Sequence, residues 1–173
     1  MNLIRSGCAL FAIFLFSAFA LTQWRLVPDS YSVKVKGSRV SATLKGLEAD
    51  IRFDPKELNT SVIRASVDAT TFSTGNFLKN MHAKSEEGLN TDQFPKIEYR
   101  SAKITAADHG FEAQGNLTLK GTTKPVLLRF TFENGGQEGL FRGTFTINPK
   151  DFGVTRNGTP DRITVSLNVP VRK

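Results

Sequence analysis

The sequence is poor in the residue types that carry out most protein chemistry. Its 173 residues include one cysteine, two histidines, one tryptophan and two tyrosines. The cysteine is Cys8, so the chain beyond it has no thiol, which excludes intramolecular disulfides and a cysteine nucleophile. His82 and His109 lie far apart in the sequence and outside any HxxxH pattern. We therefore predict no metal site.

Catalytic sequence motifs are also missing. We find no GxSxG elbow, no GxxxxGK[ST] phosphate loop and no GxGxxG fingerprint. Acidic neighbours such as Glu86 and Glu87 fit solvated positions better than a catalytic carboxylate pair. The sequence predicts no catalytic residues, no cofactor and a protein that is not an enzyme. The alternative is an enzyme that holds an apolar substrate near His82 or Asp151.

The first 20 residues differ from the rest of the chain. A short positive start ends at Arg5, an apolar run extends from Cys8 to Phe16, and Ala18-Phe19-Ala20 has the small-x-small pattern of a cleavage site. The stretch without strongly polar groups is about 14 residues, and a membrane-spanning helix needs roughly 20. We predict a cleaved signal peptide over 1–20, a periplasmic location, and a single domain over 22–173.

Few long clusters of one charge occur, but basic residues exceed acidic ones. Loss of the predicted signal peptide removes one of the 23 lysines and arginines and none of the 16 acidic residues, which leaves a net charge of +6. Such an excess fits an anionic partner. Nucleic acid is not expected, because the aromatic residues share the apolar face of the strands and the export signal removes most of that partner. Transient contact with a membrane surface and homodimer formation both stay open.

Hydrophobic and polar residues alternate along most of the chain after residue 30. Val33 and Val35 alternate with Lys34 and Lys36, for example. A period of two predicts strands with one buried face, and short turns between them predict antiparallel neighbours. We count eight or nine strands, with alternation at 33–36, 49–53, 63–67, 97–99, 111–113, 117–119, 128–132, 141–147 and 163–171.

One segment has helical spacing instead. We predict a short helix over Asn76–Glu87, capped by Thr74 or Asn76 and stopped by Gly88. Its apolar residues at helical spacing are Phe77, Leu78 and Met81.

A large sheet with one apolar face closes into a barrel or folds into a sandwich, and periodicity does not separate the two. An outer-membrane barrel is disfavoured because one tryptophan and two tyrosines are too few for two aromatic girdles. Ten of the 14 phenylalanines lie beyond residue 20. They fill the core of a sandwich, whereas in an eight-stranded barrel they could also surround a small ligand.

Three stretches carry a family resemblance. They are Phe94-Pro95-Lys96-Ile97-Glu98-Tyr99-Arg100-Ser101, the hairpin Gly115 to Pro125, and Asp151-Phe152-Gly153-Val154. With the His, Lys, Ser and acidic run at the end of the predicted helix, the chain resembles the YceI-like family of periplasmic polyisoprenoid-binding proteins over nearly all of 24–171. Two features depart from the family pattern: the first hairpin lacks the usual histidine and aromatic residue, and Gly88-Leu89 replaces two bulky hydrophobic residues.

The resemblance implies an all-β fold, an antiparallel eight-stranded lipocalin-like barrel with one short helix. It also implies non-enzymatic binding, transport or storage of a long isoprenoid, such as a polyisoprenoid or an isoprenoid quinone, or a similar lipid, in an interior tunnel. A solid-cored interaction module without a ligand is the alternative. The candidate tunnel residues are Phe53, Val67, Phe77, Met81, Tyr99, Phe111, Leu117, Phe130, Phe132, Phe141, Phe145 and Phe152.

Overall fold

The computed structural model describes residues 22–173. The predicted signal peptide, 1–20, lies outside the described residues. The elements in chain order are β1 (Gln23–Leu26), β2 (Ser32–Gly37), β3 (Ser41–Arg52), β4 (Val62–Ser73), α1 (Phe77–Lys84), β5 (Lys96–Ala107), β6 (Gly110–Leu119), β7 (Thr122–Asn134), β8 (Glu138–Ile147), the 3-10 helix η1 (Pro149–Phe152) and β9 (Ile163–Arg172).

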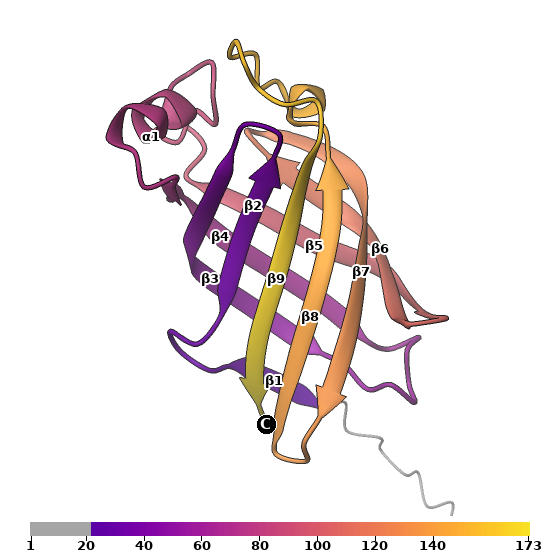
Figure 1. The fold of residues 1–173 in the computed structure, drawn as a ribbon. Coiled ribbons are helices and arrows are strands. Elements are labelled where there is room, and N and C mark those ends of the chain that lie inside the picture. The colour runs from indigo at the N-terminus through magenta and orange to yellow at the C-terminus, as the bar shows by residue number, and fades with distance from the viewer. Residues whose placement is uncertain (1–21) are drawn as a thin grey trace, which may run out of the picture.

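The strands form one closed antiparallel barrel (Figure 1). Its order is β3-β2-β9-β8-β7-β6-β5-β4, and pairing of β3 with β4 joins the two ends of the sheet. This closure excludes the sandwich. The predicted eight-stranded antiparallel barrel with one short helix is confirmed.

The ninth strand, β1, shares a barrel position with β2. Both strands pair with β3 and β9, but β1 pairs near Arg52 and Arg172, whereas β2 pairs near Ser41 and Ile163. Pro28 separates β1 from β2 along the chain, because proline has no N–H to donate to a neighbouring strand. Nine strands therefore fill eight positions around the barrel.

The connections gather at two ends of the barrel (Figure 1). We call the end that carries α1 the helix end; its connections are 38–40, 74–95, 120–121 and 148–162. The opposite end, which we call the terminal end, has the connections 53–61, 108–109 and 135–137, and both described termini.

Helix α1 is shorter than predicted. It begins as expected after Asn76, whose side chain accepts a hydrogen bond from the Lys79 amide at 3.0 Å. It ends at Lys84 instead of Glu87, because Ser85 has extended backbone and its hydroxyl donates to the His82 carbonyl at 2.8 Å. Among residues 22–173, no helix is long and apolar enough to cross a membrane.

The terminal half of the barrel is filled by an aromatic cluster. Phe53 has no exposed surface and stands at its centre. Its ring makes edge contacts with four others, at centroid distances of 5.0 to 5.5 Å. These four are Phe111, Phe130, Phe132 and Phe141. The Trp24 indole donates to the Phe53 carbonyl at 3.0 Å, which satisfies its buried N–H.

Candidate ligand-binding site

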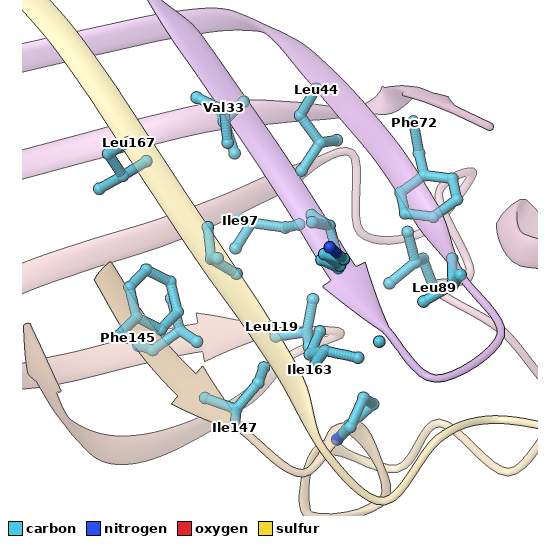
Figure 2. Close-up of a pocket in the computed structure, with 18 of the residues that line it drawn as sticks. Val33, Leu44, Phe72, Leu89, Ile97, Leu119, Phe145, Ile147, Ile163 and Leu167 are labelled. Atoms are coloured by element: carbon cyan, nitrogen blue, oxygen red, sulfur yellow. The ribbon is translucent and has the colours of Figure 1, made fainter. Parts of the chain in front are cut away.

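A cavity of about 900 Å³ occupies the helix half of the barrel. Its wall is made by inward-facing apolar side chains from almost every strand. They include Val33, Leu44, Ile97, Leu119, Phe145 and Leu167, which surround a common space in Figure 2. Phe130 and Phe141 belong both to this wall and to the aromatic cluster, so they form its floor. Residues of the 38–40, 74–95 and 148–162 connections also line the cavity, which places a mouth at the helix end.

The cavity exists because side-chain size changes along the strands. On β6 the inward residue at the terminal end is Phe111, and near the helix end it is Leu119. Likewise β8 carries Phe141 toward the terminal end and Ile147 toward the helix end. Large rings meet across an eight-stranded barrel, but aliphatic side chains leave space between opposite walls.

Polar and basic side chains surround the mouth. Lys36 approaches it from the end of β2 and Arg39 from the β2–β3 turn. Lys79 and His82 approach from α1, and Arg156 from the β8–β9 connection. The site thus combines an apolar interior with a basic rim.

Hydrogen bonds tie one side of this rim together. The Lys120 ammonium donates to the carbonyls of Glu86 and Gly153, at 2.6 and 2.7 Å. The amides of Thr155 and Arg156 both donate to the Glu87 carbonyl. Lys120 reaches these carbonyls from a two-residue hairpin turn in which both it and Gly121 have positive φ, 50° and 70°. The segment after α1 is therefore held against the β8–β9 connection.

Gly88 fits a tight exit from α1. A Cβ atom at this position would lie 2.2 Å from the Ala83 carbonyl oxygen. The next residue, Leu89, points into the cavity mouth (Figure 2). The departure from the family pattern at Gly88-Leu89 thus keeps one apolar side chain at the entrance and excludes a second.

Tyr99 brings a polar group into the apolar wall, but the group is already bonded. Its hydroxyl donates to the Ala113 carbonyl at 2.8 Å, and its ring lies against Gly115, where a Cβ would come within 2.7 Å of the ring carbon that bears the hydroxyl. Burial raises the pKa of the Tyr99 phenol. Within 22–173, no buried side-chain nitrogen or oxygen lacks a hydrogen-bond partner. The cavity interior therefore suits an apolar chain better than a polar headgroup.

The sequence-predicted site residues fall into three places. Six line the cavity: Val67, Tyr99, Leu117, Phe130, Phe141 and Phe145. Four lie in the packed core outside it: Phe53, Phe111 and Phe132 in the aromatic cluster, and Phe152 in η1. Phe77 and Met81 are exposed on α1.

Most of the wall consists of aliphatic residues that sequence reasoning did not select. Val33, Leu119 and Leu167 lie in stretches where alternation predicts inward positions, but the site prediction favoured phenylalanine, and Leu44 lies outside those stretches. The missing signal was position along the strand: in a chain of short hairpins, residues nearest the helix-bearing connection lie at one end of the barrel.

Groups suited to catalysis or metal binding are dispersed. In the described part of the chain, no three His, Cys, Asp or Glu side chains lie close enough to hold a metal ion. His82 is at the rim and His109 at the terminal end. The Lys96 ammonium, 3.0 Å from the Glu48 carboxylate, lowers the pKa of that carboxyl on the outer surface. Hydrogen bonds from Thr70 lower the pKa of Asp68.

Comparison with known families gives a match over residues 24–172 to the YceI-like domain. The chain belongs to the YceI-like family. A UPF0312 protein of Serratia proteamaculans is 28% identical to it over 135 residues, covering 75% of this chain and 70% of that protein.

Solved YceI-like structures share the fold. BcnA of Burkholderia cenocepacia has a TM-score of 0.77 at 19% identity, covering 84% of this chain and 98% of BcnA. A polyisoprenoid binding domain from Saccharophagus degradans, implicated in plant cell wall breakdown, has a TM-score of 0.63 at 11% identity, covering 86% of this chain and 97% of that domain. At these identities the likeness shows the fold alone.

Proposed function

We propose that this protein binds a long-chain isoprenoid, or a lipid with a similar tail, and carries or stores it in the periplasm without chemical change. The observation that carries the proposal is the apolar cavity of about 900 Å³ with a basic mouth at the helix end. The family supports it, since a similar fold forms the polyisoprenoid binding domain from Saccharophagus degradans. The periplasmic location rests on the predicted signal peptide.

Cavity size limits the part of the lipid that can be enclosed. A five-carbon isoprene unit occupies on the order of 100 Å³ at the packing density of organic matter, so the cavity holds about eight units when full. Strands β3 to β9 have 10 to 13 residues, so at a tilt of about 40° the barrel is roughly 25 to 34 Å tall. The aromatic cluster fills its terminal half, and about three extended units span the other half. The enclosed chain must therefore bend back on itself, and a longer chain extends through the mouth.

Apolar contact alone can supply the affinity. Burying one isoprene unit contributes up to ~4 kcal/mol at about 0.8 kcal/mol per carbon, so two or three units offset the cost of association and reach about micromolar affinity. The polar end then lies at the mouth, beside Lys79, His82 and Arg156. Such a site needs no catalytic group.

Two other functions can be weighed against the cavity. A solid-cored interaction module is incompatible with an interior space of this volume. An enzyme acting near His82 or Asp151 would need a second functional group close by, and Asp151 has only Asn148 as its side-chain hydrogen-bond partner, at 3.5 Å. Lipid carriage without chemistry is the simpler account.

The test is to express the full chain in a bacterial host, collect the exported protein from the periplasm without detergent, and record its native mass spectrum before lipid extraction. We expect a stoichiometric adduct whose fragments differ by isoprene units. Bare protein that also takes up neither a fluorescent geranylgeranyl probe nor a fatty-acyl probe would overturn the proposal. A fatty-acyl adduct alone would replace the isoprenoid by another lipid tail.

A further inference from the structure

Helix α1 turns its apolar side outward, toward solvent. Phe77, Leu78 and Met81 are 78%, 59% and 50% exposed. Within residues 22–173 they are the large hydrophobic side chains that are exposed to this degree, and no residue of α1 is buried. An ordinary surface helix packs such residues against the core.

Polar contacts hold the helix in this inverted orientation. The Asn80 side-chain oxygen accepts hydrogen bonds from the Thr74 amide at 2.7 Å and the Thr74 hydroxyl at 2.8 Å. Asn80 and Ala83 are half-buried, on the side of α1 away from the exposed apolar residues. The barrel therefore contacts the polar side of α1, and the apolar side stays free.

Basic groups accompany this apolar surface. The sequence of α1 contains Lys79 and Lys84 and no acidic residue. Lys36 at the end of β2 and Arg39 on the β2–β3 turn are exposed at the same cavity mouth and make no ion pair within the described part of the chain. The acidic residues after the helix are Glu86 and Glu87, and Glu87 lies 3.8 Å from the Arg156 guanidinium.

We propose that α1 docks this protein on an anionic phospholipid bilayer, with Phe77, Leu78 and Met81 inserted among the headgroups and Lys79 and Arg39 contacting lipid phosphates. A short helix with one apolar and one basic side binds in this way. Because α1 also contributes Lys79, His82 and Ala83 to the cavity lining, docking of its opposite side places the mouth beside the membrane. This proposal adds a membrane partner to the proposed function. The purpose of docking, lipid transfer, rests on that function.

A bilayer suits this surface better than a protein partner. An eight-residue helix is about 12 Å long, and three side chains on it cover far less than the roughly 800 Å² per partner of a stable protein interface. Interfacial insertion needs only a few apolar side chains together with attraction to anionic lipids.

The experiment is vesicle flotation with protein purified from the periplasm, its N-terminus read by mass spectrometry. Vesicles of phosphatidylcholine with phosphatidylglycerol are compared with phosphatidylcholine alone. We expect binding to the anionic vesicles that weakens with salt. The triple variant F77S/L78S/M81S should lower the partition coefficient by about 100-fold. R39E/K79E should weaken binding to anionic vesicles more than K56E/K103E, which makes the same charge change at exposed positions toward the terminal end.

Each result decides the matter. Equal flotation of the triple variant and the natural protein, or no flotation at low salt, overturns docking. Concentration-dependent dimerisation that the triple variant abolishes, without flotation, assigns the surface to a second copy of this chain and also overturns it. Uptake of the geranylgeranyl probe in vesicle-free solution separates the two proposals. Flotation without uptake supports docking and contradicts the proposed function; uptake without flotation does the reverse. All variants are checked by circular dichroism.

Discussion

Single residues decide where the barrel is solid and where it is hollow. Alternation in the sequence identifies the inward residues, and most of the predicted inward phenylalanines are buried. It does not tell how far along the barrel axis each one lies. Phe53 and Phe145 both face inward, yet one fills the terminal half and the other lines the cavity. For this reason Phe53, Phe111 and Phe132 lie outside the cavity, whereas Phe77, Met81 and Phe152 lie outside it because they belong to α1 and η1.

Filling the cavity at one position should block the ligand. Ile97→Trp replaces an aliphatic side chain in the cavity wall by a larger indole ring. We expect affinity for the geranylgeranyl probe to fall by about 10-fold or more, because several buried carbons of the ligand are displaced. Fluorescence titration measures it. Arg100→Trp is the matched control, since Arg100 is exposed on the same strand. Equal affinities for the two variants would contradict the position of the site.

Tyr99 should make the protein less stable at alkaline pH. A tyrosine in the unfolded chain titrates near pH 10, and burial raises the pKa of Tyr99 in the folded protein. Above about pH 10 the unfolded state then binds fewer protons than the folded state, so the free energy of unfolding falls as pH rises. Tyr99→Phe should cost about 1 kcal/mol near neutral pH through the lost hydrogen bond to Ala113 and flatten the alkaline decline.

Denaturant titrations from pH 8 to about 11 measure this effect. Tyr31→Phe is the control, because it removes the only other tyrosine and leaves Tyr99 in place. A decline of the same slope in Tyr99→Phe would show that other groups cause it.

At the scale of elements, local sequence signals were accurate where the contacts are local. The β6–β7 turn lies at Lys120-Gly121, within the hairpin Gly115 to Pro125 that the sequence indicates, and both turn residues have the positive φ that such a two-residue turn needs. The start of α1 follows from the Asn76 cap. Its end at Lys84 depends on contacts with the following segment, such as the bond from the Leu89 amide to the Ala83 carbonyl at 2.7 Å, which no helical signal encodes.

Lys120 should stiffen the rim. Lys120→Ala removes its hydrogen bonds to the carbonyls of Glu86 and Gly153. We expect a loss of about 1 kcal/mol, because these bonds are exposed, with faster amide exchange over 85–88 and 153–156. Hydrogen-exchange mass spectrometry measures it. Lys124→Ala, on β7 beyond the same turn, should leave exchange there unchanged; equal acceleration in both variants would rule out this role of Lys120.

At the scale of the whole molecule, the alternating pattern of the strands does not predict that the sheet closes into a barrel. Seven of the eight seams join strands that are consecutive in the chain, but the eighth pairs β2 with β9, which are far apart in the sequence. Alternation is the same in a sandwich and in a barrel. The family resemblance, not the periodicity, supplied the correct choice.

The enclosed volume should set a limit on useful ligand length. We expect affinity to rise by roughly 10-fold or more with each added isoprene unit while the cavity fills, and to level off at about eight units, since later units stay in water. Competition between prenyl alcohols of increasing length and the fluorescent probe measures this. A continued rise beyond that length would mean that the chain finds further apolar surface outside the barrel.

The floor of Phe130 and Phe141 lies across the cavity from the mouth at the helix end, so a tail that meets the floor has to return toward that mouth. A lipid held there enters tail first and leaves in the reverse order, through the same opening. One protein molecule therefore cannot receive cargo from one membrane while handing it to another. It must depart, diffuse and turn its opening to the acceptor, so transfer between two vesicle populations should scale with the amount of protein and not with the frequency of vesicle collisions.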